Sequence, residues 1–413
     1  MLTRVFRAFK YRDFRLMWLG ACTSSIGTWM QKLAQAWLVF ELSKSPFLLG
    51  LDAFLAELPI FLFSLVGGAI ADRHDRRHLL LFSQYVQMAC AFALALLVAL
   101  GQVQVWHILA LSFVSGFGQA FGAPAYQALL PSLVPLKDLS NAIALNSIQF
   151  NLARVVGPVL GGLALTHLGA AWCFGLNGFS FIPVIITIMM VRARYVPAKS
   201  SSTLIASMRQ GLSFVRAREG MRPLVVLAFL MTMLGVPISV FLPVFASEVF
   251  HQGPNAYTVL LSTFGAGSIV GALGVAALTR QVNQGRTTLY LLIVLGVVTG
   301  AFALSTVMAL SLVFLFIAGA CLVAVFSLVA TLVQEITSDA MRGRVMSVYN
   351  VAFRGGMPAG SLVTGALVPH TGAPAALAAN GFLLCCLGFF YLFAHRGVAR
   401  LGAAKTAVRI GGE

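Results

Sequence analysis

Charged residues are scarce in this chain of 413 amino acids, where they make up 10% of the sequence against 59% hydrophobic residues. A soluble protein of this length needs more polar surface, so this composition argues against a soluble globular fold. A membrane-spanning helix needs about 20 predominantly apolar residues. The sequence contains twelve such apolar runs, at 16–40, 47–71, 79–100, 106–130, 142–166, 171–191, 223–247, 257–279, 288–308, 310–333, 345–368 and 374–394. We therefore predict an all-α membrane protein with twelve transmembrane helices.

Signatures of several other protein classes are also absent. The G-x4-G-K-[ST] loop that cradles nucleotide phosphates does not occur, which argues against ATP as the energy source. The six cysteines lie in apolar runs at irregular spacing, a pattern typical of neither a disulfide framework nor a metal site. His74 and His78 lie in a basic loop without a third metal ligand nearby, so we expect solvated histidines. We expect no cofactor, no bound metal and no enzymatic activity.

Basic residues outnumber acidic ones by 28 to 12, and their placement along the chain is uneven. If the N-terminus lies inside the cell, all but four of them fall in cytoplasmic segments. The exceptions are Lys44 in an outer loop and Lys32, Arg154 and Arg354 within apolar runs. This asymmetry follows the positive-inside rule and predicts that both termini are cytoplasmic. The basic charge thus orients the protein in lipid, and we expect no nucleic-acid partner.

The longest hydrophilic stretch, 192–222, separates the first six apolar runs from the last six. Within it, apolar residues from Leu204 to Val215 recur at helical spacing opposite Arg209 and Arg216. This pattern predicts a short helix that lies on the inner membrane surface or, as the alternative, binds a partner. The predicted organisation is a six-helix half at 1–191, a cytoplasmic linker with this amphipathic helix at 192–222, a second six-helix half at 223–394 and a cytoplasmic tail at 395–413.

One apolar run ends in an ordered cluster of glycine, acid and arginine: Gly68, Asp72, Arg73, Arg76 and Arg77. A plain stop-transfer cluster would need only Lys or Arg. The pattern resembles the G-x-x-x-D-R-x-x-R-R signature of the major facilitator superfamily, which lies between the second and third membrane helices of that family. The resemblance implies that Asp72 holds the inner side shut by pairing with basic groups and the N-terminus of helix eleven. The alternative is a solvated loop acid.

A second motif occurs in the fifth apolar run, at Gly157, Pro158, Gly161 and Gly162. Proline cannot donate a backbone hydrogen bond, so it kinks the helix, and the glycines allow a neighbour to approach closely. The motif resembles the g-x-x-x-G-P-x-x-G-G antiporter motif of drug and metabolite exporters, with Ala153 in place of its first glycine. Ordinary packing of small residues is the alternative.

Longer stretches resemble one branch of the same superfamily, which contains the enterobactin exporter, the macrolide efflux proteins and the transmembrane secretion effectors. The stretches include Ile26–Gln31, Ala128–Pro135 and Arg342–Tyr349. This resemblance implies two six-helix halves, proton-driven export of a small molecule and, in the usual case, a monomer. A 200-residue shift also places Arg154 on Arg354, a weak repeat that fits two related halves. Members of the branch carry unlike substrates, so the cargo does not follow.

Five ionisable residues lie inside apolar runs, where each should have a partner because buried charge is costly: Lys32, Asp52, Glu57, Arg154 and Arg354. Glu57 is the first candidate for the proton-carrying carboxylate. Asp52 is the second, or a structural acid near the N-terminus of a helix for which Ser45 is the expected cap and Pro46 the expected first residue. We expect the Lys32 side chain either to extend toward the outer membrane face or to contact substrate. We expect Arg154 either to bind the backbone carbonyls that the proline kink leaves free or to bind an anion. Arg354 and Glu57 are expected at the same depth in the membrane, so we expect them to pair with each other. The alternative is that each charge faces a water-filled cavity or pairs within its own half.

These features predict a proton-coupled efflux transporter for a small amphipathic molecule, such as a drug or siderophore, in the bacterial inner membrane. A proton-coupled importer of a small nutrient is the first alternative. A non-transporting membrane sensor or assembly factor is the second. Loss of the Glu57 carboxylate should separate transporters from the last class.

Overall fold

The computed structural model describes residues 6–71, 75–191, 204–218, 220–278, 283–338, 341–394 and 397–401. Every regular element within these ranges is a helix. Contacts divide the chain into two compact units, and each is described here by itself. Unit 1 comprises Met1–Lys44 and Leu55–Ser201, and unit 2 comprises Ser45–Phe54 and Ser202–Glu413. The sequence-based division at 191 and 222 stays a prediction.

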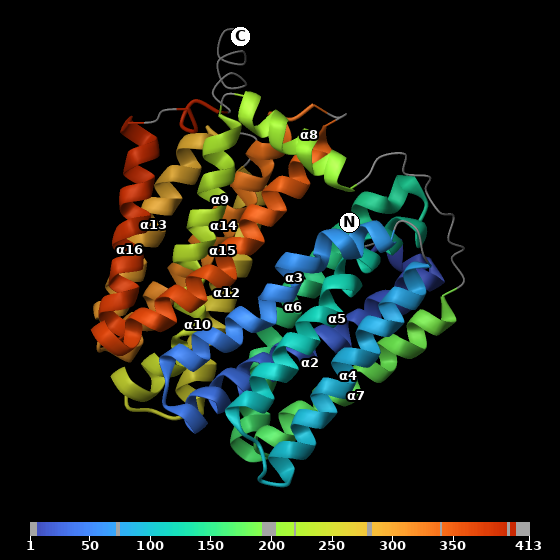
Figure 1. Cartoon of the computed structure of the whole chain (residues 1–413), viewed down its shortest axis with the longest axis vertical. Coiled ribbons are helices and arrows are strands. Elements are labelled where there is room, and N and C mark those ends of the chain that lie inside the picture. The colour runs from blue at the N-terminus through green and yellow to red at the C-terminus, as the bar shows by residue number, and fades with distance from the viewer. Residues whose placement is uncertain are drawn as a thin grey trace. The chain divides into compact units, whose positions relative to one another are not determined.

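Unit 1 is built from long helices that pack side by side (Figure 1). It contains η1 (Arg7–Lys10), α2 (Arg12–Ser43), most of α3 (Pro46–Ala71), α4 (Arg76–Ala99), α5 (Val105–Leu129), η2 (Leu130–Ser132), α6 (Leu136–His167) and α7 (Ala170–Met190). Helix α2 packs against both α6 and α7, and α4 packs against α5 and α7. Helices α2 and α4 thus both contact α7, and each packs against one further long helix.

Unit 2 has a similar architecture, with one helix broken into pieces. It contains the start of α3, α8 (Leu204–Ala217), α9 (Met221–Gly235), α10 (Pro237–Val240), α11 (Leu242–Val244), η3 (Phe245–Val249), α12 (Pro254–Leu278), α13 (Gln284–Leu304), α14 (Met308–Glu335), α15 (Arg342–Thr371), α16 (Ala373–Phe389) and η4 (Phe390–Ala394). The run 223–247 was expected to form one helix. It is instead interrupted at Val236 and Phe241, just before the short helices α10 and α11, each of which has a proline at its first or second position. Proline lacks the N–H that continues a helix.

The helix predicted in the hydrophilic stretch is present as α8, at one end of unit 2 (Figure 1). Its Gly211 lies against the backbone of Arg344 in α15, where a Cβ would stand 2.5 Å from the carbonyl oxygen. Val215 is buried, whereas Arg209 and Arg216 are exposed. The side of α8 that carries Gly211 and Val215 therefore packs on unit 2 itself, and its basic side faces outward.

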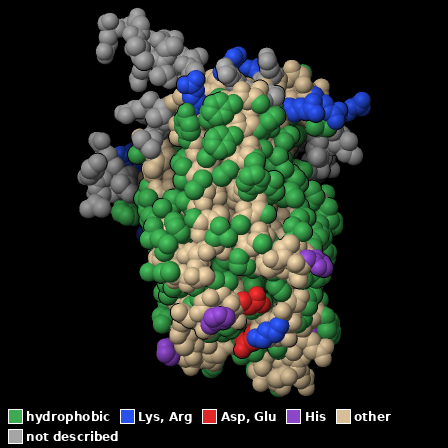
Figure 2. Space-filling model, turned by 90° about the vertical axis from the view of Figure 1, so that its left-hand side faces the viewer, with side chains coloured by type: hydrophobic (Ala, Val, Ile, Leu, Met, Phe, Trp, Pro, Cys, Tyr) green, Lys and Arg blue, Asp and Glu red, His purple; other side chains and the backbone are tan. Residues whose placement is uncertain are grey.

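Hydrophobic side chains cover much of the outer surface, as Figure 2 shows for one face, where most of the visible Lys and Arg lie at one end and another basic patch lies beside acidic side chains near the other end. Such an exposed apolar surface is stable in lipid and not in water. Ten helices in the described ranges are long and apolar enough to cross a membrane. The two other long helices, α2 and α15, are more polar and carry Lys32 and Arg354. The chain is a multi-pass membrane protein, and the crossing of α2 and α15 stays a prediction.

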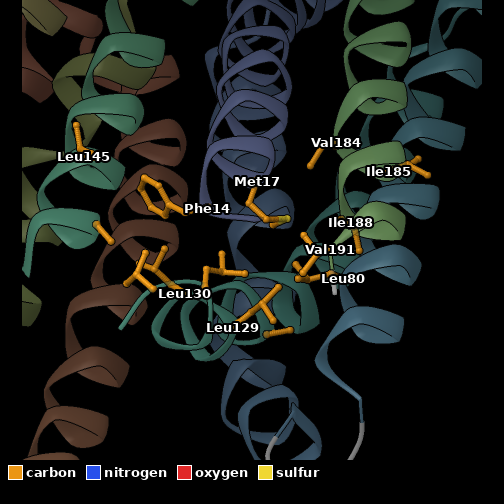
Figure 3. Packing of buried hydrophobic residues seen from close by; sticks show 14 of the residues in the cluster. Phe14, Met17, Leu80, Leu129, Leu130, Leu145, Val184, Ile185, Ile188 and Val191 are labelled. Carbon is orange, nitrogen blue, oxygen red and sulfur yellow. The ribbon is translucent and has the colours of Figure 1, made fainter. Parts of the chain in front are cut away.

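The buried core of unit 1 includes a cluster near the N-terminal end of α2 (Figure 3). Phe14 and Met17 of α2 lie between Leu145 of α6 and Ile188 of α7, and each is at most 1% exposed. Leu130, in the turn after α5, closes the cluster. Lipid is as apolar as these side chains, so close van der Waals packing stabilises the contact rather than transfer out of water.

Glycines mark the closest helix contacts in both units. A Cβ at Gly157 of α6 would stand 2.5 Å from Trp29 Cβ of α2, and one at Gly161 would stand 3.0 Å from Met30. In unit 2, Gly356 and Gly360 of α15 lie against the backbone of α9 in the same way. The same small-residue spacing therefore joins the fifth long helix to the first in unit 1, and α15 to α9 in unit 2.

Candidate functional site

A chain of polar side chains crosses the interior of unit 1. Asn177 of α7 donates to Gln31 of α2 (2.6 Å), Gln31 donates to Gln35 (3.3 Å), and Gln35 donates to Ser112 of α5 (2.8 Å). Buried polar groups in an apolar surrounding must be satisfied by one another, so these bonds tie three helices together. Gln31 and Gln35 lie next to Lys32 along α2.

Two cations flank one aromatic ring beside this chain. The Lys32 ammonium lies 5.1 Å from the centroid of the Trp29 ring, and the Arg154 guanidinium carbon lies 5.6 Å from it. Phe150 meets the same ring edge-on at 6.3 Å. The glycine at Gly157 gives Trp29 its room, because any side chain there would collide with it. Gly157 of the antiporter-like motif thus allows α6 to pack closely against Trp29, whose ring both cations contact.

The sequence pattern alone did not single out Trp29. One signal was available, since Trp29 and Lys32 are three residues apart and therefore neighbours on one helix face. The approach of Arg154 could not be read from spacing, because it depends on how α6 packs on α2.

The two acidic candidates, Asp52 and Glu57, both lie on α3 but belong to different units. Helix α3 begins at Pro46, and the Leu48 N–H donates to the Ser45 hydroxyl at 3.4 Å, which confirms the expected N-terminal cap. Asp52 is 6% exposed and groups with unit 2, as does half-buried Arg354 of α15. Glu57 is half-buried and groups with unit 1. Pairing of Glu57 with Arg354 stays a prediction.

Asp72 and Arg73 of the loop motif lie outside the described residues, while its last two arginines have clear partners. Arg76 donates to the Ala128 carbonyl at the end of α5 (2.6 Å), and Arg77 donates to the Met189 carbonyl at the end of α7 (3.0 Å). The last carbonyls of a helix lack intrahelical donors and carry partial negative charge. Both arginines therefore stabilise helix ends within unit 1, a role that the motif did not predict.

The two glycines before this loop differ in their surroundings. A Cβ at Gly67 would stand 2.5 Å from the Ala120 carbonyl of α5. A Cβ at Gly68 would meet no described atom within 4 Å. The close helix approach lies at Gly67, one residue before the motif glycine.

A buried carboxylate at the start of α6 was missed by sequence reasoning, because Asp138 follows Lys137 in what looks like a solvated loop. Its side chain is 1% exposed and accepts a hydrogen bond from the Tyr11 hydroxyl at 2.6 Å. Lys10 lies 3.4 Å and Arg7 3.8 Å from its oxygens. Tyr11 and the Asp138 carboxylate raise the pKa of Lys10 above its ordinary value. This cluster attaches η1 to α6.

The chain is similar to known exporters along most of its length. It is 26% identical to the multidrug efflux pump Tap of Mycolicibacterium fortuitum, over 92% of this chain and 95% of the relative. It is 27% identical to the enterobactin exporter EntS of Shigella boydii serotype 4, over 92% of this chain and 91% of the relative. Macrolide efflux protein A of Streptococcus pyogenes is 22% identical over 64% of this chain and 67% of the relative.

Solved structures agree on the fold. A peptide transporter POT in complex with sulfate superposes with a TM-score of 0.76 at 14% identity, covering 94% of this chain and 95% of that chain. A bacterial homologue of the human lysosomal transporter Spinster gives a TM-score of 0.72 at 15% identity, covering 94% and 97%. These proteins and the relatives are transporters rather than enzymes. Residues 3–402 match the transmembrane secretion effector family, and the chain belongs to that family of the major facilitator superfamily, as its motifs indicated.

Proposed function

We propose that this protein exports small amphipathic molecules across the bacterial inner membrane in exchange for protons. In this proposal its twelve helices form two six-helix halves that expose a binding site alternately to either side, with both termini in the cytoplasm. The single observation that carries the proposal is similarity to drug, macrolide and enterobactin exporters over most of the chain. The polar and charged side chains gathered around α2 support it, since a transporter needs such groups within its membrane helices.

Glu57 is the proposed proton carrier. A carboxylate inside an apolar helix costs several kcal/mol less when it is neutral, so its protonation state changes which surroundings it prefers. Its half-buried position allows both a protein partner and access for protons. Asp52 is the second candidate, and its lower exposure and place two turns from the start of α3 fit a structural role equally well.

The test uses purified protein in liposomes with an acidic lumen and a pH-sensitive dye inside. The external compounds are a macrolide and enterobactin, the cargoes named for two relatives. We expect a transported compound to accumulate while the lumen becomes more alkaline, because protons leave in exchange. Glu57→Gln should lose this pH-driven uptake and retain exchange of labelled for unlabelled compound, which needs no net proton movement.

Glu41→Gln is the matched control, because Glu41 is exposed near the end of α2 and should leave uptake unchanged. Protons that move in the same direction as the compound would indicate an importer. Undiminished pH-driven uptake by Glu57→Gln would remove Glu57 from the coupling step. Failure of folded protein to move either compound in exchange would favour a sensor or assembly factor.

A further inference from the structure

Three segments that are far apart in the sequence meet at the end of unit 2 that carries α8 (Figure 1). The Leu401 carbonyl accepts a hydrogen bond from the Gly285 N–H at the start of α13 (3.2 Å), and a Cβ at Gly285 would collide with the Val398 carbonyl. The Leu401 side chain would stand 3.6 Å from a Cβ at Gly220, which directly precedes α9. Val398 is fully buried. The segment 397–401 is therefore docked on the starts of both α9 and α13.

Exposed arginines surround this meeting point, and we call them the arginine junction: Arg218, Arg222, Arg286 and Arg400. Each is one or two residues from one of the contacting positions Gly220, Gly285 and Leu401. Within the described ranges, none of the four guanidinium groups forms an ion pair with a carboxylate. Glu219 follows Arg218 in the sequence and lies outside the described residues, and its single negative charge would still leave three positive charges in excess. Folding thus concentrates positive charge from three segments at one place, which favours an anionic occupant.

The arginine junction lies where two candidate membrane spans begin. The spans of α9 and α13 start one and two residues before Arg222 and Arg286, and the two helices contact each other. Val226 and Tyr290 each follow one of these arginines by four residues, so they lie on the same side of their helix and about 6 Å further into the span. Their side chains are 41% and 54% exposed. Positive charge at the level of the lipid phosphates is therefore followed directly by apolar surface, which a phospholipid can cover and a soluble anion cannot.

We propose that the arginine junction binds the phosphates of an anionic phospholipid whose acyl chains lie along α9 and α13. Guanidinium groups match phosphate oxygens through paired hydrogen bonds, and the N-terminal ends of α9 and α13 add partial positive charge. Basic residues gathered between membrane helices suit cardiolipin, which carries two phosphates. The bound lipid would join the segment 397–401 to the starts of both helices. This site depends on neither the direction nor the coupling of transport.

The test is native mass spectrometry of the delipidated protein titrated with three probes: tetraoleoyl cardiolipin, dioleoyl phosphatidylglycerol and zwitterionic dioleoyl phosphatidylcholine. We expect cardiolipin to bind at least about tenfold more tightly than phosphatidylcholine, with phosphatidylglycerol between them. Arg222→Gln combined with Arg286→Gln should weaken cardiolipin binding about tenfold, or about 1.4 kcal/mol, and leave phosphatidylcholine unchanged. Arg222→Lys combined with Arg286→Lys keeps both charges and should retain the preference for the anionic lipids.

Arg15→Gln combined with Arg209→Gln is the matched control, because it removes two exposed arginines that belong to none of the three segments. It should leave cardiolipin binding unchanged. If the Arg222 and Arg286 variant fails to fold, Arg400→Gln compared with Arg209→Gln makes the same distinction with exposed single residues. Equal binding of cardiolipin and phosphatidylcholine, or equal effects of the two double glutamine variants, would overturn the inference. Displacement of cardiolipin at constant ionic strength by inorganic phosphate or by polyglutamate would also overturn it, and would assign the arginines to a free phosphate or to an acidic protein.

Discussion

Asp138 illustrates how strongly a single side chain can depend on its surroundings. In the sequence it is one acid beside a lysine, yet in the structure it is almost fully buried and contacts Tyr11, Lys10 and Arg7. The Asn141 side chain accepts a further bond from the Ala8 N–H at 2.8 Å, so the start of α6 holds η1 at two points. A carboxylate with this many partners is a structural anchor, because its removal leaves the part-buried Tyr11 hydroxyl without its acceptor.

We predict that Asp138→Ala lowers the melting temperature of the purified protein by several degrees. The variant removes the acceptor of the Tyr11 hydroxyl and the counter-charge of Lys10 and Arg7. Asp138→Asn should lose less, since its amide oxygen still accepts the Tyr11 bond. Thermal unfolding in detergent, followed by size-exclusion chromatography, makes the comparison. Glu41→Ala is the control, as Glu41 is exposed near the end of α2. Equal melting temperatures for Asp138→Ala and the wild type would refute the anchor.

At the scale of whole helices, contacts depend on where the backbone can approach a neighbour. The helices α6 and α15 contact α2 and α9 through pairs of glycines, and α3 contacts α5 through Gly67. Membrane helices pack through such small residues because lipid provides no hydrophobic force between them. The arginines at the start of α4 add a second kind of contact, in which a cation stabilises the end of another helix.

Adjacent glycines in α3 provide a test with its control one residue away. Gly67→Ala places a methyl group against the Ala120 carbonyl, which cannot move without shifting α5. We expect a loss of about 1–3 kcal/mol of stability, the usual cost of overpacking. Gly68→Ala meets no described atom within 4 Å and should leave the melting temperature unchanged or slightly raised, since alanine favours helix over glycine. The reverse order of the two melting temperatures would show that α3 packs on α5 through a different face.

At the scale of the whole molecule, the exposed apolar surface and the basic segments set how the chain lies in a bilayer. Trp106 and Trp172 are 60% and 55% exposed at the starts of α5 and α7, where an aromatic belt would contact the lipid headgroups. The predicted orientation places these ends outside the cell and the termini inside.

Labelling of single cysteines tests this orientation after the six native thiols have been replaced. Lys44→Cys and Asn255→Cys should react with an impermeant thiol reagent added to intact cells, since both positions are exposed between predicted spans. His74→Cys and Ser201→Cys should react only after the cells are permeabilised. Labelling of His74→Cys in intact cells together with protection of Lys44→Cys would reverse every loop assignment.

Much of this protein followed from local rules that the sequence alone determines. Long apolar runs must be helices in lipid, because only a helix satisfies the backbone polar groups of a single segment. The cap at Ser45 and the helix at 204–217 followed from residue type and helical spacing. Family membership followed from the loop motif, because a plain stop-transfer cluster would not need its order of glycine, acid and arginine.

The tertiary structure alone decided which residues of different helices meet. Helical geometry sets the depth and direction of each side chain to within a few ångströms, but the choice of partner depends on how close two backbones come. For that reason Gly67 rather than Gly68 contacts α5, and Arg154 of α6 joins Lys32 at Trp29. Asp138 is buried for the same reason, because only the folded chain brings η1 onto the start of α6.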